Sequence, residues 1–116
     1  MADDVAIRFA KALEHKKNGE YDEAEALFLS VIAEQPGNAD AYHELGLTYS
    51  FRVKDDTIPT LERAVQLNPN SVRFLITLGK TYAMYAEDIK ARSAFERVLQ
   101  IDPFNDEAQN NLQYLS

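Results

Sequence analysis

Residues 75–82 read LITLGKTY and residues 91–103 read ARSAFERVLQIDP, and together the two segments predict a pair of helices. In each segment the apolar residues recur at spacings of three and four, which places them on one face of a helix. Those of the first segment are Leu75, Leu78, Gly79 and Tyr82. A short polar bend separates the segments. Pro103 ends the second one, because proline lacks the backbone N–H and clashes with the preceding helical turn.

The same arrangement recurs at a nearly constant period along the chain. The Leu-Gly pair at 45–46 returns at 78–79. Three prolines follow with almost the same spacing, at Pro36, Pro69 and Pro103. A fixed period of about 34 residues with one helix pair per period is the sequence signature of an α-solenoid. We therefore predict an all-α fold.

These residues resemble the tetratricopeptide repeat (TPR) family, and the resemblance covers nearly the whole chain. It implies an α-α superhelix of three antiparallel helix pairs and one terminal helix, forming a single domain over residues 1–116. The expected repeats are about 5–38, 39–71 and 72–105, and the capping helix is about 105–115. The individual helices are expected at 3–17, 21–34, 39–52, 57–67, 72–85, 88–100 and 105–115.

Two departures from the family's pattern leave questions for the structure. In the first helix, Arg8, Lys11 and His15 stand where the family has apolar or aromatic residues. This helix is either shifted by a residue or two, or loosely packed as the terminal member of the stack. In addition, the turns at 53–56 and 85–88 lack the glycine found at 19, which leaves their local geometry open.

Composition and charge exclude several classes of function. The formal net charge is −7, which argues against a nucleic-acid partner because binding to phosphate backbones requires a basic surface. The chain has no cysteine, so disulfides, thiolate metal sites and cysteine nucleophiles are excluded. Because its first residues are acidic and no long apolar run follows, we expect neither a signal peptide nor membrane insertion. We expect a cytoplasmic protein.

The sequence offers little that would support catalysis. The four glycines are scattered and build no phosphate-binding loop. His15 and His43 lie on different expected helices without carboxylates at ligand spacing, and they are interpreted as surface or groove side chains. No motif of a hydrolase or metalloprotease is present. We expect a protein that is not an enzyme and needs no cofactor or metal.

The resemblance implies that the first helix of each pair lines a concave groove. The peptide-binding residues mapped to this groove are Phe9, Leu13, Lys17, His43, Leu47, Phe51, Arg73, Ile76, Lys80 and Met84. Most of them are apolar, and contiguous exposed apolar surface usually marks a contact site. The sequence therefore predicts a protein–protein interaction scaffold or adaptor that binds a partner peptide or helix. The three basic residues of the set would attract acidic flanks of that partner.

One subtype and two alternatives can be stated. Chaperone-binding members of the family clamp a C-terminal carboxylate, and the corresponding positions here are Phe9, Leu13, Glu44, Arg73 and Thr77. Only Arg73 fits such a clamp, so we expect no binding to acidic chaperone tails. One alternative function is a self-assembling structural module, in which copies of the chain form homo-oligomers. The other is a regulatory or targeting segment of a larger protein. The sequence does not identify the partner or the pathway.

Overall fold

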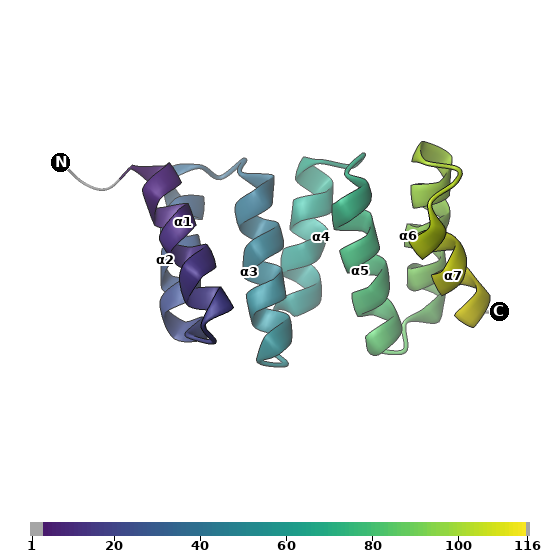
Figure 1. Cartoon of the computed structure of the whole chain (residues 1–116), viewed down its shortest axis with the longest axis horizontal. Coiled ribbons are helices and arrows are strands. Elements are labelled where there is room, and N and C mark those ends of the chain that lie inside the picture. Colours follow the sequence, from purple (N-terminus) through teal and green to yellow (C-terminus); the bar gives the residue numbers. More distant parts are fainter. Residues whose placement is uncertain (1–3, 116) are drawn as a thin grey trace. The chain divides into compact units, whose positions relative to one another are not determined.

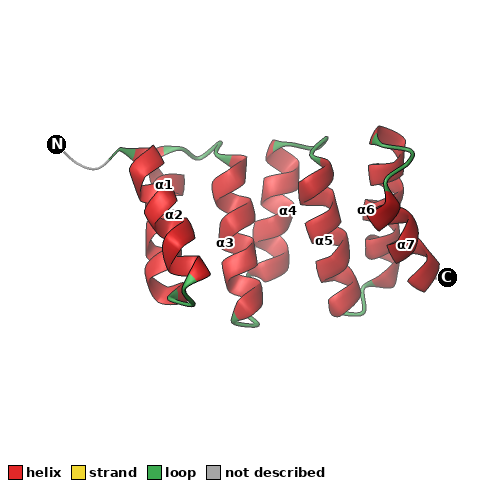
Figure 2. Ribbon diagram, viewed as in Figure 1, coloured by secondary structure: helices red, strands yellow, loops and turns green. Residues whose placement is uncertain are grey.

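The computed structural model describes residues 4–115, and the regular structure in this range is entirely helical (Figures 1 and 2). The helices are α1 (Val5–Lys17), α2 (Tyr21–Glu34), α3 (Ala39–Phe51), α4 (Thr57–Leu67), α5 (Val72–Met84), α6 (Asp88–Ile101) and α7 (Asp106–Tyr114). The expected all-α fold of helix pairs is confirmed, and every expected bound lies within two residues of the observed one.

The helices group into two compact units. The first contains α1 to α4 and ends at Leu67, and the second begins at Asn68 and contains α5 to α7. In the first unit, α1 packs against α2 and α3 against α4, while α3 also contacts α2 and α1. In the second unit, α5 packs against α6, and α7 contacts both. The expectation of a single domain over residues 1–116 stays a prediction.

Four helices begin in the same way, with a capping side chain. In each case the side-chain oxygen of the residue before the helix accepts a hydrogen bond from the backbone N–H three residues later. The pairs are Asp4–Ile7 at 2.8 Å, Asn38–Ala41 at 3.0 Å, Ser71–Phe74 at 3.2 Å and Asn105–Ala108 at 2.9 Å. Such a cap is worth about 1 kcal/mol. Each cap precedes the first helix of a pair or the final helix, so the caps follow the repeat. Asp3, a second acidic residue before α1 that the sequence would allow as its cap, lies outside the described residues.

The turns inside the helix pairs share one geometry, although only the first contains glycine. Gly19, Val53 and Ala86 all have positive φ, at 77°, 51° and 60°. The next N–H then bonds to the carbonyl five residues back. These bonds are Glu20–His15 at 2.8 Å, Lys54–Tyr49 at 3.2 Å and Glu87–Tyr82 at 2.8 Å. This is the Schellman arrangement that ends many helices. The two turns without glycine therefore keep the same geometry, and Val53 and Ala86 adopt the left-handed backbone conformation there.

The second repeat is shorter than the others because one residue is missing before α4. Thr57 is 1% exposed and takes the place of Ala24 and Ala91, which are both fully buried. The missing residue lies between Val53 and Thr57, so α4 starts late and is shorter than α2 and α6. Pro59 is the third residue of α4, in the first turn, where a helix N–H has no intrahelical acceptor.

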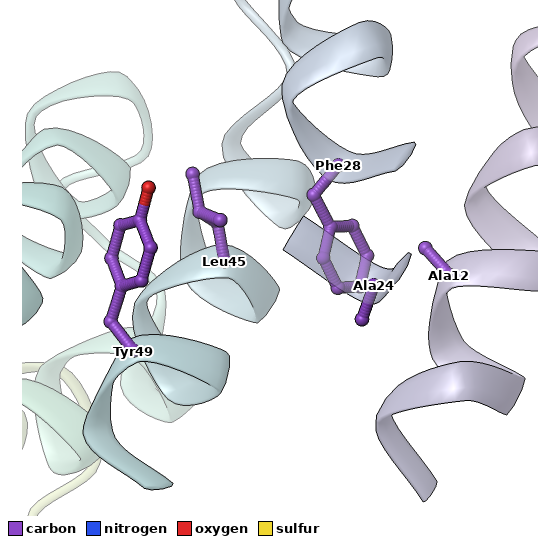
Figure 3. Close-up of a cluster of buried hydrophobic side chains, with 5 residues drawn as sticks. All are labelled: Ala12, Ala24, Phe28, Leu45 and Tyr49. Carbon is purple, nitrogen blue, oxygen red and sulfur yellow. The ribbon is translucent and has the colours of Figure 1, made fainter. Parts of the chain in front are cut away.

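The core of the first unit shows that α1 keeps the expected register. Phe28 of α2 is fully buried, and Figure 3 shows its ring between Ala12 of α1 and Leu45 of α3. Ala12 is also fully buried and lies at the repeat position that Gly46 occupies in α3. The helix is therefore not shifted. Arg8, which stands at the repeat position of Leu75, instead bonds to Ser30 and Glu34 of α2.

Candidate functional site

The α1 residues of the candidate site lie at the border between core and surface. Phe9 and Leu13 are both half-buried and pack against the core cluster around Phe28. The ring of Phe9 meets that of Phe28 edge to face, with centroids 5.7 Å apart. Lys17, at the end of α1, is exposed. The two apolar residues therefore stabilise the first unit and also present part of their surface to solvent.

The exposed apolar surface of α3 is concentrated at its C-terminal end. Leu47 is half-buried, whereas the side chain of Phe51 is 59% exposed. The ring of Phe51 stacks on that of Tyr21 from α2, with centroids 5.5 Å apart and an interplanar angle of 18°. One ring therefore supports the other. This holds a large aromatic side chain in place at the surface, where it is available to a partner.

A buried ionic cluster joins α1 to α3. His43 is 2% exposed and Glu44 8% exposed, and the ammonium of Lys16 in α1 pairs with the carboxylate of Glu44 in α3. Burial alone raises the pKa of Glu44, but hydrogen bonds from His43 and Lys16 outweigh it and lower this pKa from 4.5 to about 2. The pair is therefore charged at neutral pH and ties α1 to α3. His43 is a buried member of this cluster, not the surface or groove side chain expected from the sequence.

The second unit exposes four predicted site residues to different degrees. Arg73 is exposed, with its guanidinium carbon 5.2 Å from the ring centroid of Phe74, and Ile76 is half-buried. Lys80 forms an exposed ion pair with Glu107 of α7 at 2.9 Å. Met84 is 74% exposed. It lies one repeat period after Phe51, so both units expose a large apolar side chain at the same repeat position.

An open pocket of about 310 Å³ lies between the N-terminal ends of α1 and α3. It is lined by Val5, Ala6, Phe9, Gln35, Asn38 and Asp40. Phe9 is thus the one predicted site residue that the structure places in this pocket. The other lining residues come from the first turns of the two helices and from the loop before α3.

Sequence reasoning omitted several surface residues of the same kind. Tyr114 of α7 is 90% exposed and lies one repeat period after Lys80, so the period alone could have identified it. The loop residues Gln35 and Asn38 had no such signal, because the pattern marks them only as a helix end and a cap. Among residues 4–115 no cluster of three or more metal-ligating side chains is found. None of the described helices is long and apolar enough to cross a bilayer.

The helix pairs, their common caps and their common turns define a helical-repeat protein. Comparison with known proteins gives the family, since the tetratricopeptide repeat model matches residues 5–38, the range expected for the first repeat. The chain belongs to the tetratricopeptide repeat family, whose domains mediate protein–protein interactions. The described helices fit three repeats and a capping helix.

The curated relatives are much longer than this chain. Human protein O-mannosyl-transferase TMTC3 is 32% identical over 103 residues, which is 87% of this chain and 11% of that protein. Anaphase-promoting complex subunit 3 of Schizosaccharomyces pombe is 26% identical over 77% of this chain and 14% of its own length. The mouse PEX5-related protein is 25% identical over 82% and 17%. The chain thus spans 11–17% of these relatives.

Solved structures match nearly the whole chain. The first TPR domain of Spaghetti (RPAP3), bound to the HSP90 peptide SRMEEVD, has a TM-score of 0.85 and 26% identity, and the match covers 96% of this chain and 89% of that one. The first TPR domain of human RPAP3 has a TM-score of 0.83 and 26% identity, with 96% and 88% covered. The MamA protein, at 23% identity and a TM-score of 0.85 over 96% and 61%, shows the fold alone.

Proposed function

We propose that the chain is an adaptor that binds a peptide or helix of a partner protein through the first helices of its repeats. The observation that carries this proposal is the exposure of Phe51 and Met84, which are 59% and 74% exposed at the same position of two repeats. Aromatic and methionine side chains are enriched in protein interfaces, and exposed apolar surface usually marks a contact. The half-buried Leu47 and Ile76 lie earlier on the same helices.

Selection from a random-peptide display library tests this proposal without knowledge of the partner. The Phe51→Glu/Met84→Glu variant should retain the selected peptides at least about tenfold more weakly, because each glutamate places a charge where an apolar anchor would be buried. Ile89→Glu is the matched control, since Ile89 is 87% exposed but lies on α6, the second helix of its pair. Equal retention by the double variant and the wild type would contradict the proposal.

The chemistry of the face also predicts which peptides are rejected. The related Spaghetti domain binds the acidic peptide SRMEEVD. Here the buried, ionised Glu44 and the apolar Phe9 and Leu13 stand at positions where carboxylate-binding members hold polar or basic side chains. We therefore expect no saturable binding of SRMEEVD in a calorimetric titration at micromolar protein concentration. Saturable binding would contradict this part of the proposal.

We further infer a non-catalytic, cytoplasmic role. The family is generally an interaction module, and the human relative named as a transferase is matched over only 11% of its length. A match over so little of the transferase gives no reason to assign its transferase activity to this chain. Imaging of a fluorescently tagged chain in its source cell tests the location, and exclusion from the cytoplasm would contradict it.

A further inference from the structure

Two aromatic rings from different helices form a stacked pair at the surface of the first unit. Tyr21 is the first residue of α2, and Phe51 is the last residue of α3. Their ring centroids lie 5.5 Å apart, and the ring planes differ by only 18°. Tyr21 is half-buried, whereas Phe51 is 59% exposed. Because stacking uses one face of the Phe51 ring, this exposure leaves the opposite face to a partner.

The residues that directly follow the two rings are joined as well. They are Asp22 in α2 and Arg52 at the end of α3, and their side chains form an ion pair at 2.7 Å. Arg52 also pairs with Glu25 at 3.1 Å. The pair with Asp22 is exposed and contributes little free energy. Together with the ring contact, however, it fixes the end of α3 on the start of α2 and so restricts the orientation of Phe51.

The turn between the helices of a pair does not require an aromatic residue at the position of Tyr21. In the third repeat the corresponding first residue of α6 is Asp88, and residues 54–56 of the second repeat are Lys-Asp-Asp. All three turns nevertheless have the same Schellman geometry. The aromatic ring of Tyr21 therefore has a role other than forming the turn, and the ring that it stacks on is that of Phe51.

An apolar ring with one free face suits a further aromatic ring. Aromatic side chains prefer offset-stacked or edge-to-face contacts, which add to the gain from burial. An arginine of the partner could also stack on a ring. However, the carboxylates of Asp22 and Glu25 already pair with Arg52, and Glu25 also pairs with Lys54 at 3.3 Å. A partner arginine would have to compete with these cations, whereas a neutral ring would not.

We propose that Phe51 binds an aromatic side chain of the partner peptide by stacking, and that Tyr21 is the positioning residue that holds the Phe51 ring for this contact. The inference rests on the proposed peptide-binding function and specifies its chemistry. A ring that is already held in place loses less side-chain entropy when the partner binds. Tyr21 acts through Phe51 and need not touch the partner.

Degenerate N-acetylated peptide libraries test the chemistry of the partner. Four libraries differ only in one fixed residue, which is phenylalanine, cyclohexylalanine, norleucine or arginine. Cyclohexylalanine is close to phenylalanine in size but has a puckered ring without π electrons, so this comparison isolates stacking from burial. We expect immobilised protein to retain the phenylalanine library about threefold more than the cyclohexylalanine library, the effect of one aromatic pair.

Substitutions at the two rings test the positioning role. Tyr21→Phe keeps the ring and should keep the preference for phenylalanine, whereas Tyr21→Leu removes the flat support and should abolish most of it. Phe51→Leu should abolish the preference with or without Tyr21→Leu, because Tyr21 acts through Phe51. The ratio of two libraries on one protein does not depend on how much of that protein is folded, so a loss of stability does not imitate the effect. An unchanged preference in Tyr21→Leu would overturn the positioning role.

The stack can also be tested in the free protein, without any partner. We expect nuclear Overhauser contacts between the ring protons of Tyr21 and those of Phe51. Their absence would overturn the positioning role whatever the libraries show.

The outcomes separate this inference from the proposed function. Equal retention of the phenylalanine and cyclohexylalanine libraries by the wild type, with all libraries weakened by Phe51→Glu/Met84→Glu, would overturn aromatic stacking and support the binding face. The highest retention of the arginine library would overturn the choice of an aromatic side chain. Retention of none of the libraries would contradict the proposed function as well.

Discussion

Within residues 4–115, two residues other than glycine occupy a backbone conformation that favours glycine. Val53 and Ala86 have φ values of 51° and 60° in turns where the first repeat has Gly19. A non-glycine residue in this region costs about 1–2 kcal/mol, and the cost is highest for β-branched valine. The structure therefore stores strain at two exposed turns, because the Schellman bonds and the packing of the adjacent helices impose the conformation.

Replacing these residues by glycine should stabilise the protein. We expect Val53→Gly to raise the free energy of unfolding by about 1 kcal/mol and Ala86→Gly by about 0.5 kcal/mol, after subtraction of the entropy that glycine adds to the unfolded chain. Val53 is 78% exposed, so little packing is lost. Urea titration provides the measurement. Gly19→Ala should destabilise by a similar amount, and the account of strain would be wrong if all three changes had the same sign.

Gly46 illustrates a different use of glycine, in helix packing. A Cβ atom at this position would lie 2.5 Å from Cδ2 and 2.6 Å from Cγ of Leu61 in α4. Overpacking costs about 1–3 kcal/mol, which outweighs the gain of about 1 kcal/mol in helix propensity. We expect Gly46→Ala to lower the free energy of unfolding by about 1 kcal/mol. Gly37→Ala is the control, because nothing lies within 4 Å of its Cβ position. A stabilised Gly46→Ala protein would contradict the close approach of α3 and α4.

At the residue scale the sequence predicted packing better than strain. The Leu-Gly pairs at 45–46 and 78–79 lie at close helix contacts, and the sequence carries that signal because glycine inside a helix is costly without a packing reason. The turn at Val53 could not be predicted, since local preference opposes its conformation and only the assembled helix pair imposes it. The buried state of His43 was also missed, because Glu44 beside it pairs with Lys16 of another helix.

At the scale of the elements, the ion pair between Lys16 and Glu44 links α1 to α3. Glu44 has a pKa of about 2, below its ordinary value of 4.5, so its charged form is stabilised by folding. This contribution is fully present above about pH 4.5 and is lost as the pH falls through about 2. A depression of this size corresponds to about 3 kcal/mol.

The Glu44→Gln variant tests the contribution of this ion pair, through the pH dependence of its free energy of unfolding. Urea titrations should show the variant less stable than the wild type by about 3 kcal/mol at pH 7 and by about 1 kcal/mol at pH 3. Lys80 and Glu107 form an exposed pair between α5 and α7, so Glu107→Gln should cost well under 1 kcal/mol at either pH. A deficit in Glu44→Gln that is independent of pH would mean that the ion pair is not its cause.

Element boundaries were largely predictable, because prolines, asparagines and acidic residues mark where these helices start and stop. Asn38 caps α3 and Asn105 caps α7. Contacts between elements that are far apart in the sequence were harder to predict. The Lys16–Glu44 pair spans 28 residues, and the period aligns equivalent positions without showing which side chains of neighbouring repeats meet.

For the whole molecule, the main alternative to partner binding is self-assembly through the same apolar residues. A module that binds other proteins should remain a monomer near 13.1 kDa in light scattering as its concentration is raised. Growth of the molar mass with concentration would favour the self-assembling alternative, particularly if Phe51→Glu abolished it. An Ile89→Glu protein again serves as the control, because that residue lies on α6.

The family and the general function followed from the repeat period, which is a property of the whole chain. The candidate site was only partly accessible from the sequence. Repeat mapping placed Phe51 and Met84 at equivalent positions, and the structure adds that these two are the most exposed of the predicted apolar site residues. The pocket beside Phe9 was not predicted, since two loop residues and the starts of two helices form it together.

Amide chemical-shift mapping with a peptide selected from the display library tests the binding face most directly. The account predicts the largest shifts on α1, α3 and α5, near Phe9, Phe51 and Met84, and small shifts along α2, α4 and α6. Shifts concentrated on α2, α4 and α6, with α1, α3 and α5 unaffected, would contradict it.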